Sequence, residues 1–157
     1  MTNRDTPLRA EDELRHLLHA KNLRVTPDRL RVFRALADAP KPLSMAAIIN
    51  LVAFDGVNQA TVYRTMEQFL AMAVVHAVLL HDGVVAYELV PPFASHHHHF
   101  ICLECGHVED LAQDRVDTAL THSLEGLGLH VMGHKIDLYG LCKACVAAGA
   151  NADSAPL

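Results

Sequence analysis

The stretch Ser95-His-His-His-His-Phe-Ile-Cys-Leu-Glu-Cys-Gly106 places four consecutive histidines directly before a C-x-x-C pair. A second pair, Cys142-Lys-Ala-Cys145, lies near the C-terminus, and these four are the only cysteines of the chain. Thiolates and imidazoles are the ligands that zinc and similar metals prefer in proteins. The stretch therefore predicts a metal-binding protein, and the remaining sequence has to explain what the metal controls.

The four cysteines have the spacing of a structural zinc site, in which each pair forms a tight turn that presents two sulfurs. Cys102, Cys105, Cys142 and Cys145 would fill all four positions around a tetrahedral ion, so no position remains for a reactive water. We expect such a site to tie the last strand to the central hairpin and to couple metal binding to folding. Four buried free cysteines or a redox pair are the alternatives, and the two matched pairs favour zinc.

The histidine run is able to serve two further metal sites. Side chains of an extended segment alternate between faces, so His96 and His98 would point one way and His97 and His99 the other. The side chains available to complete such sites are His76, Glu88, Asp110, Asp117, His122, His130 and His134. A solvated polar loop is the alternative. An expression tag is disfavoured because the run is internal and continues into Phe100-Ile101-Cys102.

Length and composition are those of an ordinary globular protein. The chain has 157 residues, of which 51% are hydrophobic and 20% charged, enough to bury one core or two small ones. No apolar run approaches the roughly 20 residues of a membrane span, and the N-terminus lacks the apolar segment of a signal peptide. We expect a cytoplasmic protein with no membrane partner, where paired cysteines bind metal rather than form disulfides.

The net charge of −5 argues against nucleic acid as a partner, but the distribution of charge does not. Between Leu14 and Val75 the chain has eight basic residues against four acidic ones, and from Leu89 onward it has three basic against eight acidic. A basic half on an acidic protein is compatible with a DNA contact that is confined to one module.

The N-terminal half has the pattern of a winged helix-turn-helix. Apolar periodicity and cap residues predict four helices, over Glu11–Lys21, from Pro27 to before Pro40, from Ser44 to about Ala53, and from Gln59 to about Met72. Thr26, Ser44 and Asn58 are the expected N-caps of the last three. Two strands, Val74–Leu80 and Val84–Val90, would form a hairpin, the wing. The fourth helix would enter the major groove, with Gln59, Ala60, Tyr63 and Arg64 on its polar face.

Pro91-Pro92 is the clearest break in the chain. The sequence predicts a winged-helix domain over 1–90, with 1–10 disordered, a hinge over 91–94, a second domain over 95–146 and a flexible tail over 147–157. The second domain would contain strands through His99–Cys102 and near His107–Leu111, an amphipathic helix over Asp114–Leu127, and strands over Leu129–Met132 and Lys135–Leu141. The predicted fold class is α+β.

Several blocks of the chain resemble one known family in their residues and order. Thr26-Pro-Asp-Arg29, Ala60-Thr-Val-Tyr-Arg-Thr65, His96–Gly106 and Leu138-Tyr-Gly-Leu-Cys-Lys-Ala-Cys145 are similar to the ferric uptake regulator (Fur) family. The resemblance runs from about Asn22 to Cys145. It implies a dimeric, metal-sensing transcription factor, usually a repressor, with an N-terminal winged helix and a C-terminal α/β dimerisation domain.

The resemblance also implies roles for individual residues. The four cysteines correspond to the structural zinc site. The residues that resemble ligands of a sensing site are His76, Glu88, His97, His99 and Asp110, and those that resemble a second site are His96, His98, Asp117 and His134. Tyr63 and Arg64 lie where the recognition helix meets operator DNA. We expect Lys21, Arg24 and Arg29 to add salt-dependent contacts to the DNA backbone.

Two departures from the family pattern bear on the metal that is sensed. Pro40-Lys-Pro-Leu43 lacks the histidine that iron- and peroxide-sensing members generally have there, and Glu88–Val90 lacks the hinge cysteine of many zinc-sensing members. The first departure disfavours iron as the sensed metal, and the second weakens the case for zinc. His76 and the Gly140–Val146 ending favour a zinc uptake regulator, while Fe2+, Mn2+ and peroxide responses remain alternatives.

The expected function is that of a homodimeric, metal-dependent regulator that binds double-stranded operator DNA when its sensing site is loaded. Metal bound by residues on both sides of Pro91-Pro92 would bias the angle between the domains. A metallohydrolase would need an open metal position and a spacing such as H-E-x-x-H, which is absent, so no enzyme activity is expected. A metal-storage or metal-chaperone module would explain the histidines but not the winged-helix pattern.

Overall fold

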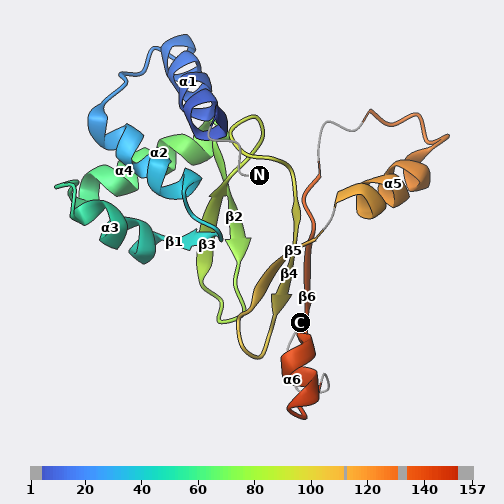
Figure 1. The fold of residues 1–157 in the computed structure, drawn as a ribbon. Coiled ribbons are helices and arrows are strands. Elements are labelled where there is room, and N and C mark those ends of the chain that lie inside the picture. Colours follow the sequence, from blue (N-terminus) through green and yellow to red (C-terminus); the bar gives the residue numbers. More distant parts are fainter. Residues whose placement is uncertain (1–4, 112, 131–133, 152–157) are drawn as a thin grey trace. The chain divides into compact units, whose positions relative to one another are not determined.

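The structure is a computed structural model that describes residues 5–111, 113–130 and 134–151 (Figure 1). The contacts between residues divide the chain into two compact units. Unit 1 comprises Met1–Leu79 and Val84–Ser95, and unit 2 comprises Leu80–Gly83 and His96–Leu157. None of the helices in the described ranges combines the length and the apolar composition that crossing a membrane requires.

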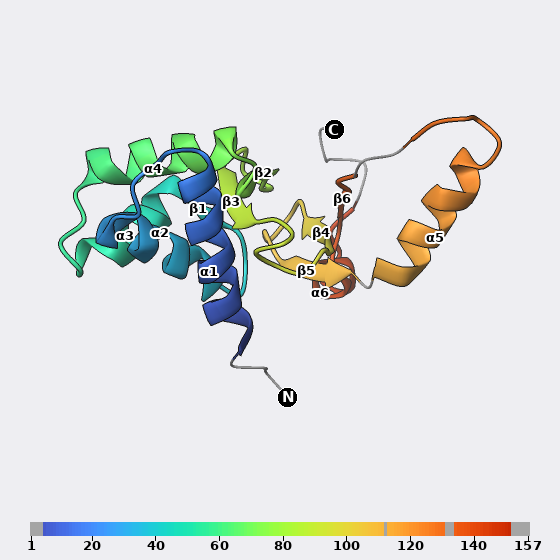
Figure 2. The same cartoon turned by 90° about the horizontal axis from the view of Figure 1, so that it is seen from above.

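Unit 1 consists of helices and one small sheet. The helices are α1 (Asp5–Ala20), α2 (Pro27–Ala37), α3 (Met45–Ala53) and α4 (Gln59–Ala71), and the strands are β1 (Leu43–Ser44), β2 (Val75–Leu79) and β3 (Val85–Leu89). The strands are antiparallel in the order β1-β3-β2. Figures 1 and 2 both show the four helices gathered beside this sheet. The hairpin predicted from the sequence is present as β2 and β3.

The helix starts of unit 1 follow from local side-chain chemistry. The three expected caps accept hydrogen bonds from the first turns of α2, α3 and α4: Thr26 Oγ1 from the N–H of Arg29, Ser44 Oγ from that of Ala47, and Asn58 Oδ1 from that of Thr61. Each bond satisfies a backbone donor that the helix itself leaves unpaired. All three predicted N-caps are confirmed.

The core of unit 1 joins its helices through aromatic side chains. Phe33 of α2 packs edge-on against Phe69 of α4 and against Phe93, with ring centroids 6.3 and 5.9 Å apart. Phe93 is 5% exposed. The division between the units falls after Ser95, so part of the hinge predicted over 91–94 packs in the core of unit 1.

The first helix begins earlier than the sequence indicated. Disorder was expected over 1–10, but α1 starts at Asp5, while residues 1–4 lie outside the described part. The reason is that Asp5-Thr-Pro7 has the composition of a helix start, and Ala10 is buried against the core of unit 1. Tertiary packing thus extends a helix whose first turns have no apolar stripe.

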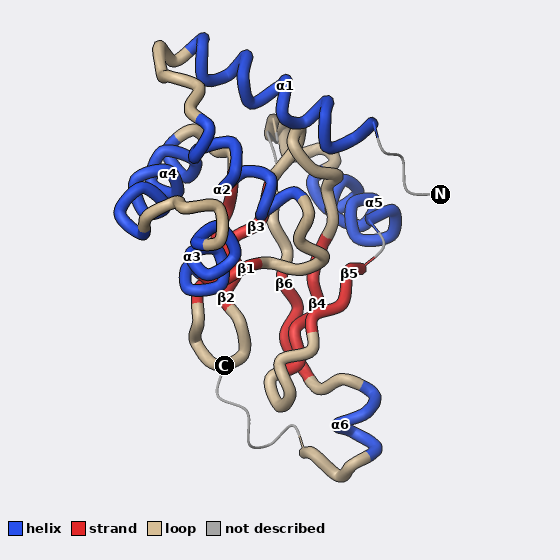
Figure 3. Tube along the Cα trace, turned by 60° about the vertical axis from the view of Figure 1, so that its left-hand side comes forward, coloured by secondary structure: helices blue, strands red, loops and turns tan. Residues whose placement is uncertain are grey.

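Unit 2 is built on a three-stranded mixed sheet. Its elements are β4 (His98–Cys102), β5 (Val108–Leu111), α5 (Gln113–Leu124), β6 (Asp137–Gly140) and α6 (Lys143–Ala147). The strand order is β5-β4-β6, with β4 antiparallel to β5 and parallel to β6. Figure 3 shows β4 lying between its two neighbours, with α6 following β6.

Three details of unit 2 differ from the prediction. α5 ends at Leu124, before the expected Leu127, which is 61% exposed. The strand expected over Leu129–Met132 falls partly on residues 131–133, outside the described ranges, and the described part of it is not a strand. The sequence also missed α6, which begins between the cysteines of the second pair. Of the tail predicted over 147–157, residues 152–157 likewise lie outside the described ranges.

Candidate metal centres and nucleic-acid interface

The four cysteine side chains of unit 2 converge to form the four-cysteine cluster. Cys102 and Cys105 come from the end of β4 and the turn after it, while Cys142 and Cys145 come from the segment after β6. Their sulfur atoms all lie within 4.8 Å of one another, at 3.8 Å for Cys102–Cys145 and 3.7 Å for Cys105–Cys142. Four sulfurs at about 2.3 Å from a tetrahedral zinc ion stand about 3.8 Å apart. The donor set therefore fits zinc.

The first cysteine pair depends on a backbone turn that glycine permits. The N–H of Gly106 donates to the carbonyl of Cys102 at 3.0 Å, which closes the turn around Cys105. Gly106 has φ +70°, a left-handed conformation in which other L residues are strained. The tight turn expected of the first cysteine pair is thus present.

The thiols of the four-cysteine cluster differ in their pKa values. Burial would raise the pKa of Cys102, but the backbone N–H groups of Cys105, Cys142 and Glu104 donate to its sulfur and hold that pKa at about 6. Hydrogen bonds that the Cys145 thiol donates to Cys105 and Cys142 raise the pKa of Cys145. The backbone thus stabilises one thiolate, and further negative sulfurs are unfavourable unless they share a cation.

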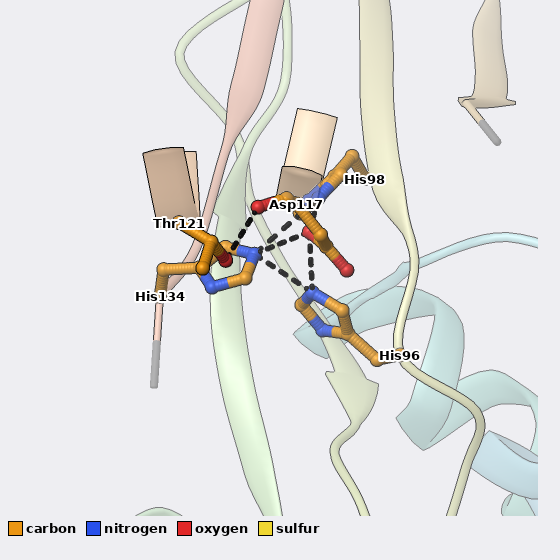
Figure 4. A network of polar contacts seen from close by, with 5 residues as sticks. All are labelled: His96, His98, Asp117, Thr121 and His134. Carbon is orange, nitrogen blue, oxygen red and sulfur yellow. Dashed lines mark hydrogen bonds and ion pairs between the residues drawn. The ribbon is translucent and has the colours of Figure 1, made fainter. Parts of the chain in front are cut away.

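A second cluster in unit 2, the histidine–aspartate cluster, consists of His96, His98, Asp117 and His134. Asp117 belongs to the first half of α5. Figure 4 shows the three histidine rings directed toward its side chain. Asp117 Oδ1 lies 2.9 Å from His98 Nε2 and 2.8 Å from His134 Nε2. Thr121 Oγ1 donates to the Asp117 carbonyl at 2.8 Å, within the same helix. The family resemblance implied these four residues as one site, and the structure brings them together.

The donor atoms of the histidine–aspartate cluster face one another closely enough to share a proton or a metal ion. The Nε2 atoms of His96 and His134 are 3.0 Å apart, and those of His98 and His134 are 3.4 Å apart. Two N–H groups cannot bond to each other, and two lone pairs repel, so a proton or a metal ion is needed between such nitrogens. Three imidazoles and one carboxylate form a complete donor set for four-coordinate zinc.

Protonation within the histidine–aspartate cluster also favours metal binding. The hydrogen bond from His98 is the largest influence on the pKa of Asp117 and lowers it, with a further contribution from His134. Burial, together with the neighbouring His134 and His98, lowers the pKa of His96. An ionised carboxylate beside a neutral imidazole is the state in which both groups bind a metal ion.

The remaining two histidines of the run lie on the other face of the chain. The ring centroids of His97 and His99 are 4.7 Å apart, and so are those of His96 and His98. The predicted alternation between faces is therefore present. His99 is 1% exposed, and its Nε2 lies 3.9 Å from Oδ1 of Asp110. Unit 2 thus holds three of the five residues expected for the sensing site close to one another.

The other two expected sensing residues belong to unit 1. His76 of β2 and Glu88 of β3 are direct partners in the antiparallel register, and His76 Nε2 contacts Glu88 Oε1. The Glu88 side chain is 11% exposed. The wing therefore presents one imidazole and one mostly buried carboxylate as a pair.

Asp137 is a carboxylate that the sequence reasoning did not select. Its Oδ1 lies 3.3 Å from His99 Nδ1, and its Oδ2 lies 2.9 Å from Lys135 Nζ. A signal was available, because Asp137 alternates with apolar residues in a predicted strand next to the cysteine pair. Two other side chains considered from the sequence, His122 and His130, join none of the clusters found among the described residues, and His122 pairs with Glu125 instead.

Helix α4 presents the residues expected to contact DNA. Gln59, Ala60 and Arg64 are exposed and Tyr63 is 44% exposed, while the opposite face buries Val62, Thr65, Met66 and Phe69. Leu70, next to Phe69 in the same helix, is 41% exposed because it lies beyond the packed stripe. A polar face on a helix that is otherwise anchored in the core is suited to a groove.

The cations expected to contact the DNA backbone differ in their surroundings. Lys21 and Arg24 are exposed. Arg29 instead donates to the carbonyl of Arg24 and to Oε1 of Gln68, and burial lowers its pKa. The geometry therefore favours a structural role for Arg29.

Comparison with known proteins assigns the chain to a family. The model of the ferric uptake regulator family matches residues 20–139. The chain belongs to the ferric uptake regulator family. Among relatives of this family, the Ferric uptake regulation protein of Bacillus subtilis (strain 168) is 28% identical over 138 residues, which cover 85% of this chain and 93% of that protein. Like its family, the chain is a metal-responsive regulator.

Solved structures of the ferric uptake regulator family show the same fold. The Helicobacter pylori ferric uptake regulator Fur matches with a TM-score of 0.75 and 20% identity, over 93% of this chain and 97% of that one. A zinc uptake regulator complexed with zinc and DNA matches with a TM-score of 0.58 and 26% identity, over 96% and 99%. The α+β prediction is confirmed: unit 1 is a winged helix, and unit 2 is the α/β dimerisation domain with its four-cysteine cluster.

Proposed function

We propose that the chain is a homodimeric repressor of metal-uptake genes, which binds operator DNA when its sensing site holds a metal ion, with zinc the favoured metal. The observation that carries the proposal is the alternation of the histidine run. The extended segment that leads into β4 directs His96 and His98 into the histidine–aspartate cluster and directs His97 and His99 to the opposite face. A chain that only stored metal would not need two separate donor sets beside a winged helix.

The proposed sensing site draws its ligands from both units: His76 and Glu88 from the wing, and His97, His99 and Asp110 from unit 2. Three imidazoles and one carboxylate suit zinc in four-coordinate geometry, and a second carboxylate would suit Fe2+ or Mn2+ in six-coordinate geometry. Zinc is favoured because Pro40-Lys-Pro-Leu43 offers no further histidine. The DNA- and zinc-bound relative supports the same metal.

A bound ion would link the donor atoms of its ligands. The effect on the protein depends on which units those ligands come from. When His76 and Glu88 share an ion with His97 and His99, fewer arrangements of the two units remain available. A ligand that binds one arrangement better shifts the population toward it, and coupling of this kind typically changes affinity about 5- to 150-fold. The proposed switch therefore needs ligands on both sides of Pro91-Pro92.

Unit 2 offers apolar surface that a second copy would cover. Among the described residues of unit 2, the exposed large apolar side chains are Leu127, Leu129, Leu138 and Val146, which are between 46% and 64% exposed. Twofold pairing of such surfaces is the commonest form of homodimer. In a dimer, two α4 helices would meet successive major-groove half-sites, which are about 34–36 Å apart.

The test is a DNA-binding titration with the full-length protein and its own upstream region as the probe. Zn2+, Fe2+ and Mn2+ are each buffered at free concentrations near cellular levels. We expect zinc to raise DNA affinity in the wild type and in His122→Ala, a control outside the clusters, but not in His97→Ala. Equal DNA binding with and without metal in all three proteins would rule out the switch. Metal binding with no DNA binding would indicate a storage module instead.

A further inference from the structure

We propose that Asp137 is a positioning residue for the sensing site: its carboxylate holds the His99 ring in the tautomer that presents Nε2 to a metal ion. The proposal rests on the sensing function proposed above, and it adds a residue that is not itself a ligand. Asp137 was not among the residues that the sequence or the family resemblance selected.

The strand register places His99 between two carboxylates. On β4, His99 pairs with Asp110 of β5 on one side and with Asp137 of β6 on the other. Residues paired across neighbouring strands project from the same face of a sheet. His99 Nε2 lies 3.9 Å from Asp110 Oδ1, and His99 Nδ1 lies 3.3 Å from Asp137 Oδ1. Each ring nitrogen therefore faces a different strand.

The two carboxylates are not equivalent. The Asp110 side chain is 65% exposed, which suits a group that must reach an ion, whereas the Asp137 side chain is 13% exposed and the His99 side chain is 1% exposed. A buried ring beside a buried carboxylate has little freedom to rotate. Asp137 thus acts on the orientation of His99, and Asp110 lies on the side where a metal would bind.

The chemistry of the pair selects one tautomer of His99. An ionised carboxylate can only accept hydrogen bonds, so a bond to Asp137 requires the proton to be on Nδ1. A neutral imidazole carries one N–H, so Nε2 then has the lone pair. A histidine that donates its other N–H to a carboxylate is a more basic ligand, and removing such a partner typically lowers metal affinity about 10- to 100-fold.

Lys135 supports the same arrangement. Its Nζ lies 2.9 Å from Oδ2 of Asp137, so the two oxygens of that carboxylate face different partners. The ammonium group contacts Oδ2 and leaves Oδ1 directed at His99. The Lys135 side chain is 35% exposed, so its contribution to the orientation of His99 is smaller than that of Asp137.

The first test compares zinc affinities of full-length variants by competition with a chromophoric chelator. Asp137→Asn keeps the shape of the side chain, and Glu109→Gln is the matched control, because Glu109 is a 65% exposed carboxylate of β5. We expect Asp137→Asn to weaken zinc binding at the sensing site about 10- to 100-fold, with zinc in the four-cysteine cluster unchanged. Glu109→Gln should bind as the wild type does. Unchanged sensing-site affinity in Asp137→Asn would overturn the proposal.

His99→Ala, measured in parallel, separates this proposal from the proposed function. If His99→Ala binds zinc and DNA as the wild type does, the sensing site itself is wrong. If His99→Ala loses metal-dependent DNA binding while Asp137→Asn retains it, only the positioning role fails.

The second test reads the tautomer directly, first in the wild type and then in the variant. In the metal-depleted wild-type protein labelled with 15N-histidine, NMR should show the proton of His99 on Nδ1. In Asp137→Asn the Nε2-protonated form should become populated. Protonation on Nε2 in the wild type would overturn the proposal. So would an Asp137→Asn variant that unfolds more easily but keeps the wild-type tautomer, because that result indicates a purely structural role.

Discussion

At the scale of single residues, Arg29 shows how a cation near a helix start can stabilise the fold rather than contact a partner. Its guanidinium donates to the Arg24 carbonyl and to Gln68 on α4. These bonds join the segment before α2 to α4, the helix expected to enter the groove. The sequence alone predicted a DNA contact, because an arginine looks the same in sequence whether its side chain points inward or outward.

Arg29→Ala should therefore lower the stability of unit 1. We expect a decrease of about 1–3 kcal/mol in the free energy of unfolding, because a carbonyl and an amide oxygen lose their donor. Urea unfolding followed by circular dichroism measures it. Arg31→Ala is the control, since Arg31 is on the same helix and only pairs with Asp28 near the surface, which is worth about 0–1 kcal/mol. Wild-type stability with a reduced salt dependence of DNA binding would instead support the sequence-based prediction.

At the scale of elements, an ionic group fixes α1 on α2. Glu11 of α1 is 9% exposed and accepts from Arg34 of α2, at 2.7 and 2.9 Å, and from Arg15, at 2.6 Å. The hydrogen bond from Arg34 is the largest influence on the pKa of Glu11, which lies below its ordinary value of 4.5. A buried carboxylate with two cationic partners stabilises the docked helix only while it is ionised.

Glu11→Gln should destabilise unit 1 at neutral pH but not in acid. Because the pKa of Glu11 is lower in the folded state, its contribution is fully present above the ordinary pKa and is lost as the pH falls through the folded value. We expect a gap of about 1–2 kcal/mol between wild type and variant at pH 7, which closes in acid. Urea midpoints across this range measure the gap. Asp12→Asn, an exposed change on α1, should show no gap, and a gap independent of pH would indicate packing rather than charge.

The recognition helix and the chain before α2 should contribute to DNA binding in different ways. Arg64→Ala should weaken binding by about 1–3 kcal/mol and relax sequence preference, because Arg64 lies on the exposed face of α4. Arg24→Ala should weaken binding to all sequences alike and reduce the salt slope by about one. Fluorescence anisotropy at several salt concentrations measures both, with Lys41→Ala as an exposed control. Equal behaviour of the two variants would contradict the assignment.

At the scale of the whole molecule, the four-cysteine cluster joins the two ends of unit 2. It links the turn after β4 to the segment after β6, with α5 between them in sequence. A cross-link that closes a long loop removes conformational entropy from the unfolded chain. Metal binding by deprotonated thiols adds its free energy to folding. Unit 2 is small and has few fully buried apolar side chains among its described residues, so the cross-link matters for its stability.

Cys142→Ser should remove one zinc per chain and unfold or dissociate unit 2, while unit 1 keeps its helices. Metal analysis, sedimentation velocity and circular dichroism measure the three effects. Lys143→Ala, which changes an exposed neighbour, serves as the control. A Cys142→Ser protein that stays dimeric and folded, and loses only its metal response, would show that the four-cysteine cluster senses metal rather than holds structure.

The local features of this protein follow from short stretches of its sequence. Asn58 caps α4 because its side chain reaches a backbone N–H three residues away, and the four histidines alternate because an extended chain alternates. The paired cysteines likewise indicate their site through spacing alone. The three-dimensional packing, in contrast, places Asp137 beside His99, 38 positions earlier in the chain, and turns Arg29 inward. Such contacts depend on the register of a parallel strand pair and on the packing of separate helices, which no local pattern specifies.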